Sequence, residues 1–482
     1  MSKSKATRSK HDKSHALDPY FEKSFDLKRQ GLRAYFGSIV KGQPKDYQVV
    51  TFAKGISTSD LLNQWYAILK SIDDRWPTLL EYEVDLAKKV GPMSIELPLK
   101  DRMSDIDSYY DGISLPSTTL SDSALRAVIT EWRSVRGLRV RNQAHTLELM
   151  RKSTNSGSPF FTKKRNVVHR TYPCDVWHDG REVFQRLPGR DWSAAAVLGW
   201  RGQEGGPSEE DVKQRVVWMF PFAVNLQELR VYQPLIESAQ KFRLVPAWNS
   251  MDEVDRRITD MFDTKSRDDL VVCTDFSKFD QHFNRSLQQA AYRILASLLS
   301  GEEADTWLAT IFPIKYMIPL AYNWGRVRFG AHGMGSGSGG TNADETLAHR
   351  ALQYEAAQIA GVKLNSNSQC LGDDGVLTYP GITVDDVVAA YTSHGLEMNP
   401  DKQYASKTDC TYLRRWHHID YRVSGVCVGV YSTMRALGRM RYLERFMDPE
   451  IWSAEAVELR WYSILQNLEY HPLREQFAQF CM

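Results

Sequence analysis

The distribution of hydrophobic and polar positions divides the chain into a helical first part, a polar stretch and a mixed second half. Residues 17–150 carry apolar positions mostly at helical spacing, with polar loops around 100–122. Residues 154–170 and 186–212 are rich in Gly, Ser, Arg and Lys, and we predict that they are loop-like. After about residue 430 the spacing is again that of helices.

Local patterns predict individual elements more sharply after residue 266. The apolar run 270–273 predicts a short strand, and apolar residues at helical spacing between 287 and 298 predict the helix that follows it. A hairpin is expected around 323–325, because Asn and Gly are typical turn residues. The glycine-rich stretch 333–340 predicts a loop.

Capping signals mark two further helices. Thr341 with Asp344 three residues later is typical of a capping box, which predicts a helix that opens at Thr341 and stops at Gly361. A second capped helix is expected from Thr383 to Gly395. Strands mixed with helices around one small sheet indicate an α+β core with appended lobes.

Composition excludes several classes of protein. The 482 residues suffice for one multi-lobed body, and 42% hydrophobic with 25% charged residues is ordinary for a soluble protein. No apolar run approaches the roughly 18 residues that a membrane-spanning helix needs, and the N-terminus lacks the apolar core of a signal peptide. Six cysteines without a CxxC pair argue against a zinc site or a disulfide framework and indicate a reducing compartment.

The charge of the whole chain is uninformative, since its net value is only +2. Its distribution says more, because the first residues carry five basic side chains against the single acid Asp12. We interpret residues 1–16 as a flexible basic arm that contacts RNA phosphate. A solvated tail without a ligand is an equally good interpretation.

Two acidic sites follow apolar strands. In the first, Asp373 and Asp374 stand between glycines and two short apolar runs, which predicts a tight hairpin turn. In the second, Asp275 follows the strand at 270–273 and Asp280 precedes the next helix. Each pattern alone is also typical of a surface turn, a strand end or a helix cap.

Together the acids suit phosphoryl transfer. That chemistry needs positioned cations on the attacking and leaving oxygens more than it needs covalent participation by the protein. Mg²⁺ prefers oxygen ligands and uses one or two carboxylates plus substrate phosphates. We therefore predict that Asp275, Asp373 and Asp374 hold two Mg²⁺ ions, for which Mn²⁺ can substitute.

These segments resemble the motifs of viral RNA-dependent RNA polymerases, in the family's order and over about 154–415. Asp275 and Asp280 match the first palm motif, Ser336, Gly337 and Thr341 the second, and Asp373 with Asp374 the third. The wording D-F-S-K-F-D and S-G-S-G-G-T-N-A-D-E-T is most similar to the picobirnavirus polymerases, enzymes of double-stranded RNA viruses related to partitiviruses.

The resemblance implies a right-hand polymerase with fingers, palm and thumb, whose palm is a small antiparallel sheet with flanking helices. It implies an enzyme that replicates and transcribes a viral RNA genome from NTPs and releases pyrophosphate. The expected boundaries are an N-terminal region with fingers at 17–265, palm at 266–304, a fingers insertion at 305–332, palm at 333–415 and thumb at 416–482.

The same resemblance assigns roles to further residues. Residues expected to bind the nucleotide are Lys213, Arg215, Asp280, Ser336, Gly337, Thr341 and Asn342. Residues expected to contact template or product RNA are Thr154, Ser156, Gly157, Pro159, Tyr412, Leu413, Arg414 and Arg415. Lys402 is expected to protonate the pyrophosphate leaving group. Exposed basic strands, glycine linkers and surface lysines are the plainer interpretations of these segments.

One position departs from the wider polymerase pattern. Many relatives carry an asparagine four residues after the threonine of the second motif, where this chain has Glu345. An ionised Glu345 facing Asp280 would be repelled unless one of the two were protonated. We therefore expect Glu345 to turn away, and Asp280 to read the ribose 2′-hydroxyl with Asn342, Thr341 or Ser336.

Other functions are compatible with parts of the pattern. A reverse transcriptase shares the palm metals but usually has an aromatic residue before its paired acids, where this chain has Leu371 and Gly372. A two-metal nuclease and a non-catalytic RNA-binding or capsid-associated protein are the further alternatives. For a polymerase the expected partners are RNA, NTPs and capsid protein, without a membrane, in the virion or host cytoplasm.

Overall fold

The structure is a computed structural model that describes residues 16–49, 51–448 and 450–482. The predicted basic arm at 1–16 therefore lies, except for its last residue, outside the described residues. Within the described ranges no helix is long and apolar enough to cross a membrane.

A four-stranded antiparallel sheet lies at the centre of the second half of the chain. Its order is β11 (Tyr404–Ser406), β6 (Val271–Thr274), β10 (Asp374–Leu377) and β9 (Gln369–Leu371). The helices packed around it are α11 (Met251–Thr264), α12 (Arg285–Leu298), α14 (Thr341–Ile359) and α15 (Val384–Thr392). Strand β6 confirms the strand predicted at 270–273. Helices α12, α14 and α15 confirm the helices predicted at 287–298, from Thr341 and from Thr383.

The two faces of this sheet belong to different hydrophobic clusters. Val271, Cys273 and Val376 pack with α11 residues, whereas Val272 and Leu377 join the main core with α12 and α14. Side chains alternate between the faces of a strand, so the two central strands β6 and β10 are buried on both sides. The sheet is consequently a rigid base for the residues at its ends.

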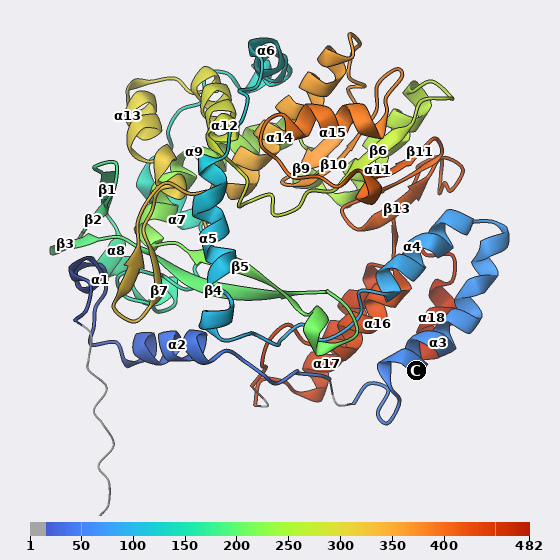
Figure 1. Cartoon of the computed structure of the whole chain (residues 1–482), viewed down its shortest axis with the longest axis horizontal. Helices are drawn as coiled ribbons and strands as arrows, with labels where there is room; N and C mark the ends of the chain where they lie inside the picture. Colours follow the sequence, from blue (N-terminus) through green and yellow to red (C-terminus); the bar gives the residue numbers. More distant parts are fainter. Residues whose placement is uncertain (1–15, 50, 449) are drawn as a thin grey trace, which may run out of the picture.

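A second sheet combines two strands that precede β6 in the chain with two strands that lie between β6 and β9. It is ordered β5 (Lys213–Met219), β4 (Ala196–Gln203), β7 (Leu320–Asn323) and β8 (Arg326–Arg328). The β4–β5 hairpin extends toward α16 (Thr433–Arg441) (Figure 1), where Glu204 accepts hydrogen bonds from Arg435 and Arg439 at 2.9–3.1 Å. Helix α9 (Phe222–Lys241) follows β5.

Two of the expected loops are regular structure. The stretch 186–212 contains all of β3 (Arg190–Ser193) and β4, because its run of small and apolar residues is buried in sheets. The polar stretch 100–122 contains α5 (Met103–Asp111), which buries Ile106, Tyr109 and Tyr110. Both predictions gave too much weight to Gly and to charged residues that face solvent.

The first and last parts of the chain share one core. Helices α3 (Thr58–Leu69) and α4 (Pro77–Ala87) pack against α16, α17 (Ala454–Gln466) and α18 (Arg474–Cys481) (Figure 1). The ring of Trp65 lies 5.0 Å from that of Phe477, and both are fully buried. Glu83 accepts hydrogen bonds from the backbone N–H groups of Thr433 and Met434, at the start of α16.

The remaining elements complete the body around these sheets. The strands β12 (Asp409–Tyr412), β13 (Arg415–His418) and β14 (Val430–Tyr431) form a small sheet beside β11. In another three-stranded sheet, β2 (Val183–Leu187) pairs with both β1 (Asp175–His178) and β3. The other helices are α1 (Pro19–Ser24), α2 (Gln30–Lys41), α6 (Asp122–Glu131), α7 (Gln143–Leu149), α8 (Val168–Thr171), α10 (Pro246–Asn249) and α13 (Glu302–Thr310).

Candidate active site

Strand pairing brings the acids of the two sequence sites together. Thr274 of β6 pairs with Gly375 of β10, so Asp275 and Asp374 are neighbours at the same end of the sheet. Asp373 occupies the two-residue turn between β9 and β10, whose first residue, Gly372, has a left-handed φ of 57°. Only glycine adopts this conformation without strain.

The turn is anchored from helix α14. The Gly372 N–H donates to Thr346 Oγ1 at 2.9 Å, and His349 Nδ1 donates to the Gly372 carbonyl at 2.9 Å. Burial lowers the pKa of His349 to about 4, so its ring is neutral at physiological pH. Helix α14 thus fixes the turn without adding charge to the site.

The carboxylates crowd one another. Burial, then the charge of Asp373, raise the pKa of Asp374 to about 7, although the Leu413 N–H donates to Asp374 Oδ2 at 2.8 Å. Burial and the neighbouring Asp280 also raise the pKa of Asp373, and Arg215 opposes that rise. Acids that raise one another's pKa form a site where a bound cation would be favoured.

Asp275 is held by its backbone. The Gln403 side chain accepts a hydrogen bond from the Asp275 N–H at 2.7 Å and donates one to its carbonyl at 2.9 Å. The Asp275 carboxylate remains exposed. Lys402, in the short 3-10 turn Pro400–Lys402, is also exposed. Gln403 carries no motif of its own, and the sequence reasoning missed it.

The acids fit a magnesium site that is completed by substrate. Among the described residues no group of three or more His, Cys, Asp or Glu side chains forms a preassembled metal cage. Magnesium sites in phosphoryl-transfer enzymes use few carboxylates and rely on phosphate oxygens and water for the remaining ligands. The oxygen-only donor set of Asp275, Asp373 and Asp374 agrees with that arrangement, and so do the raised pKa values of Asp373 and Asp374.

Strand β5 presents basic side chains toward the acids. Lys213 and Arg215 are exposed on one face of the strand, as alternation predicts. The charge of Arg215 opposes the rise in the pKa of both Asp373 and Glu345, so Arg215 lies near these acids. Gln214, on the opposite face, donates to the Met93 carbonyl at 2.9 Å and so fixes the strand.

A further cation comes from a part of the chain without a motif. Lys89 follows helix α4, and its pKa is lowered by desolvation and by the charges of Arg414 and Lys213, while Asp275 raises it. Lys89 therefore lies near Lys213 of strand β5 and near Asp275. The sequence offered no signal for Lys89, because it lies in an ordinary helical region.

The glycine-rich loop 333–340 lies flush against strand β5. A side chain at Gly337 would come within 1.6 Å of the Trp218 carbonyl oxygen. The Ser336 hydroxyl accepts from the Trp218 N–H at 3.3 Å and donates to the Val216 carbonyl at 3.4 Å. Ser336 and Gly337 thus join the loop to the strand that carries Lys213 and Arg215.

The start of helix α14 is not a capping box. Gly340 is its N-cap, and the Thr341 hydroxyl donates to the carbonyls of Gly335 and Ser338. Asp344 is fully buried and pairs with Lys315 at 3.0 Å, so it cannot bond back to the helix start. The prediction placed the helix correctly for the wrong reason.

Glu345 points into the site, contrary to expectation. Its side chain is buried, with 5% of the residue exposed. A Cβ atom added at Gly372 would lie 3.5 Å from Glu345 Oε2, so the Glu345 carboxyl group is next to the turn. Burial, then the charge of Asp280 and a hydrogen bond to it, raise the pKa of Glu345 well above its usual range. Protonation removes the repulsion that we expected to turn Glu345 away, because a neutral carboxyl group can donate a hydrogen bond to Asp280.

Asn342 lies between helix α10 and the acidic turn. Its Oδ1 accepts a hydrogen bond from the indole N–H of Trp248 at 2.8 Å. Its Nδ2 would lie 3.6 Å from a side chain at Gly372. The amide therefore links α10 to the neighbourhood of the acidic turn.

The segment Thr154–Pro159 is mostly scaffold, which corrects the expected RNA contacts. Ser156, Gly157 and Pro159 are buried, and the Ser156 carbonyl accepts from the Phe222 N–H at 2.9 Å. A side chain at Gly157 would come within 2.7 Å of the Phe220 carbonyl oxygen. Thr154 is the exposed member of the set and remains a predicted RNA contact.

Of the four residues at the tip of the β12–β13 hairpin that were expected to contact RNA, three have structural contacts and one is exposed. Tyr412 is buried in the cluster beneath the sheet, and Leu413 uses its N–H on Asp374. Arg415 makes two hydrogen bonds to the buried Asp255, at 2.7 and 3.1 Å, and is not free to bind RNA. Arg414 is exposed and lies at the turn.

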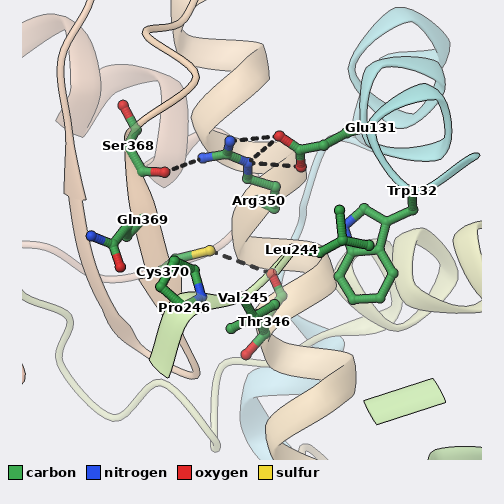
Figure 2. A pocket seen from close by; sticks show the side chains of 10 residues that line it. All are labelled: Glu131, Trp132, Leu244, Val245, Pro246, Thr346, Arg350, Ser368, Gln369 and Cys370. Carbon is green, nitrogen blue, oxygen red and sulfur yellow. Dashed lines mark hydrogen bonds and ion pairs between the residues drawn. The ribbon is translucent and has the colours of Figure 1, made fainter. Parts of the chain in front are cut away.

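A pocket next to the acidic turn is supporting structure. Figure 2 shows Arg350 of α14 between Glu131 and the Ser368 carbonyl, to which it donates at 2.7 Å. Arg350 and Glu131 approach to 2.6 Å, and Cys370 Sγ donates to the Thr346 carbonyl at 3.5 Å. These bonds tie β9 to α14 and α6 behind the turn.

The chain resembles known proteins over nearly its whole length. The family of viral RNA-dependent RNA polymerases matches residues 66–466. A potential RNA-dependent RNA polymerase of human picobirnavirus (strain Human/Thailand/Hy005102/-) is 62% identical over 462 residues, which are 96% of this chain and 86% of the relative. Crystal structures of a human picobirnavirus polymerase and of its insertion-loop deletion mutant share a TM-score of 0.95 with this chain at 62% identity. Each covers 96% of this chain, which in turn covers 89% and 92% of theirs.

Proposed function

The chain belongs to the viral RNA-dependent RNA polymerases, and from this premise we propose that it copies RNA by metal-assisted nucleotidyl transfer from NTPs. The convergence of Asp275, Asp373 and Asp374 at one end of the sheet, facing the basic strand β5, carries the proposal. The family match confirms the α+β right-hand fold and the polymerase activity. It sets aside the reverse transcriptase, the nuclease and the non-catalytic binder.

The three acids would hold two Mg²⁺ ions, or Mn²⁺ in their place. Bound ions of this kind neutralise charge on the attacking and leaving oxygens of an in-line displacement. The raised pKa values of Asp373 and Asp374 support this assignment, because both would fall when a cation relieves the crowding. The protein positions the carboxylates through the Gly372 turn and the Gln403 amide.

The surrounding residues would handle the nucleotide. Lys213 and Arg215 bind the triphosphate, because exposed basic groups beside a cation site suit phosphate oxygens. The Asp280–Glu345 pair reads the ribose, since both carboxyl groups lie close to Asp373 of the acidic turn. Lys402, two residues beyond Pro400 and next to Gln403, supplies a proton to the departing pyrophosphate.

RNA and the viral setting complete the proposal. Arg414 and Thr154 are the exposed members of the expected RNA-binding set and would contact the template or product. The likeness to picobirnavirus polymerases supports genome replication and transcription for a double-stranded RNA virus. It also supports a place in the virion or host cytoplasm, where capsid protein would be a partner.

The test is synthesis by the purified protein with RNA, labelled NTPs and Mg²⁺ or Mn²⁺. Template-length labelled product is expected, whereas shortened RNA would indicate a nuclease and unchanged but shifted RNA a binder. Asp275→Ala and Asp373→Ala should abolish synthesis and leave RNA binding largely intact, because phosphate contacts are spread over many residues. A variant that keeps about a tenth of wild-type turnover would remove its residue from the metal site.

A further inference from the structure

We infer that Glu228 of helix α9 is a positioning residue that holds the glycine-rich loop 333–340 in the conformation that binds the nucleotide. The inference rests on the proposed function of Ser336 and Gly337 in this loop. Glu228 belongs to none of the motifs recognised in the sequence. Its contacts, its charge environment and the shape of the loop support the assignment.

Glu228 binds three consecutive loop residues, directly or through one neighbour. Its Oε2 accepts a hydrogen bond from the Ser338 hydroxyl, and its Oε1 accepts one from the Gly339 N–H at 3.1 Å. Asn225, one turn earlier on α9, donates to Glu228 Oε1 at 3.2 Å and to the Gly337 carbonyl at 3.2 Å. The side chain of Glu228 is fully buried beneath the loop.

The loop depends on such contacts because its own sequence does little to restrain it. Five of its eight residues are glycine, and glycine loses more conformational freedom on ordering than any other residue. The loop also packs closely against helix α9, since a Cβ atom added at Gly340 would lie 2.3 Å from the Tyr232 ring. Glu228 is thus a buried polar anchor for the part of the loop that lies on α9, in addition to the Ser336 hydrogen bonds that join the loop to β5.

The charges below the loop favour a carboxylate at this position. Burial raises the pKa of Glu228, while the buried Lys315 ammonium and the donated hydrogen bonds lower it. Lys315 pairs with Asp344 at 3.0 Å, and Asp344 accepts from the hydroxyls of Tyr232 at 2.7 Å and Tyr316 at 2.6 Å. An ionised carboxylate is an acceptor only, which matches the three donors around Glu228.

The position of the loop matters for the substrate rather than only for stability. Ser336 and Gly337 contact the backbone of Trp218 in strand β5. The same strand carries Lys213 and Arg215. Glu228 therefore sets the loop against the strand proposed to bind the triphosphate. A loop that is not held should weaken nucleotide binding and sugar selection, while RNA binding elsewhere stays intact.

The experiment compares Glu228→Gln with Glu83→Gln. Glu83 is equally buried and accepts from the Ser432 hydroxyl at 2.7 Å and the Thr433 N–H at 2.9 Å, far from the loop. Both variants should lower the melting temperature. Glu228→Gln alone should raise the KM for NTPs about tenfold, with a smaller change in kcat, and should reduce the preference for ribonucleotides.

Ser338→Ala provides a second variant that leaves the buried charge in place. It should raise the KM in the same direction, and the double variant should be no worse than Glu228→Gln alone, because both remove one interaction. The inference is overturned if Glu228→Gln changes the KM no more than Glu83→Gln does, or if the effects of Glu228→Gln and Ser338→Ala simply add. Wild-type protein that makes no RNA would instead refute the proposed function.

Discussion

Two adjacent arginines at the β12–β13 hairpin should respond oppositely to the same substitution. Arg415 is 13% exposed and donates two hydrogen bonds to Asp255, whose side chain is 2% exposed. His417 lies 3.9 Å from Asp255, but burial lowers its pKa to about 4, so it supplies no replacement charge. Arg415→Leu therefore leaves a buried, uncompensated carboxylate, which costs about 3–5 kcal/mol of unfolding free energy.

Arg414 provides the matched control. Its guanidinium is 48% exposed and lies 3.7 Å from Glu204, an ion pair that contributes about 0–1 kcal/mol at such exposure. Arg414→Leu should therefore leave stability nearly unchanged. If Arg414 binds one phosphate, its loss should reduce the slope of log affinity against log salt by about 0.7 for single-stranded RNA.

Urea unfolding and RNA binding at several salt concentrations separate the two effects. Asp255→Asn combined with Arg415→Leu should recover much of the lost stability, because the unpaired charge is gone. The reasoning is refuted if Arg415→Leu unfolds like the wild type and binds RNA weakly. It is equally refuted if the double variant is less stable than Arg415→Leu alone.

Four further predictions concern the active site. The folded-state pKa of about 7 at Asp374 is raised, so its stabilising contribution is present below about pH 4 and is lost as pH rises through 7. Mg²⁺ should therefore raise the melting temperature more at about pH 8 than at about pH 6, and an equal effect would contradict this assignment. Lys213→Ala and Arg215→Ala should raise the KM for NTPs about tenfold or more in steady-state kinetics, and unchanged values would place β5 away from the triphosphate. Lys402→Leu should slow single-turnover incorporation roughly 10²–10⁴-fold, and an unaltered rate across the alkaline range would make Lys402 a surface residue. Glu345→Ala should lose discrimination against deoxyribonucleotides while Glu345→Gln, which can still donate to Asp280, keeps most of it; the reverse order would exclude Glu345 from sugar reading.

The parts of the site that could be predicted from sequence depend on local chemistry. The acidic turn has its own signature, because Gly372 supplies a left-handed residue between two apolar strands. The alternation that exposes Lys213 and Arg215 together is likewise a property of a single strand. The core strand at 270–273 and the helix that follows it could also be predicted, because the spacing of apolar residues is a local property of the sequence.

The parts that were missed depend on partners distant in sequence. Arg415 looks like an RNA-binding arginine until Asp255, 160 residues earlier, is placed beside it. Glu345 was expected to turn away because its burial, and therefore its protonation, cannot be read from neighbouring residues. Lys89 and Gln403 lack any local signature, since their positions near Asp275 arise from packing between separate segments.

The shared core of α3 and α4 with α16–α18 has a consequence for biosynthesis. Glu83 bonds to Thr433, 350 residues later, so the first helices leave the ribosome long before their packing partners exist. At the usual 5–20 residues per second, this delay is roughly 20–70 s, during which Trp65 and its neighbours stay exposed. A nascent chain of this protein should therefore need chaperone protection of its N-terminal helices, and a chain released without its last helix should be a substrate for degradation.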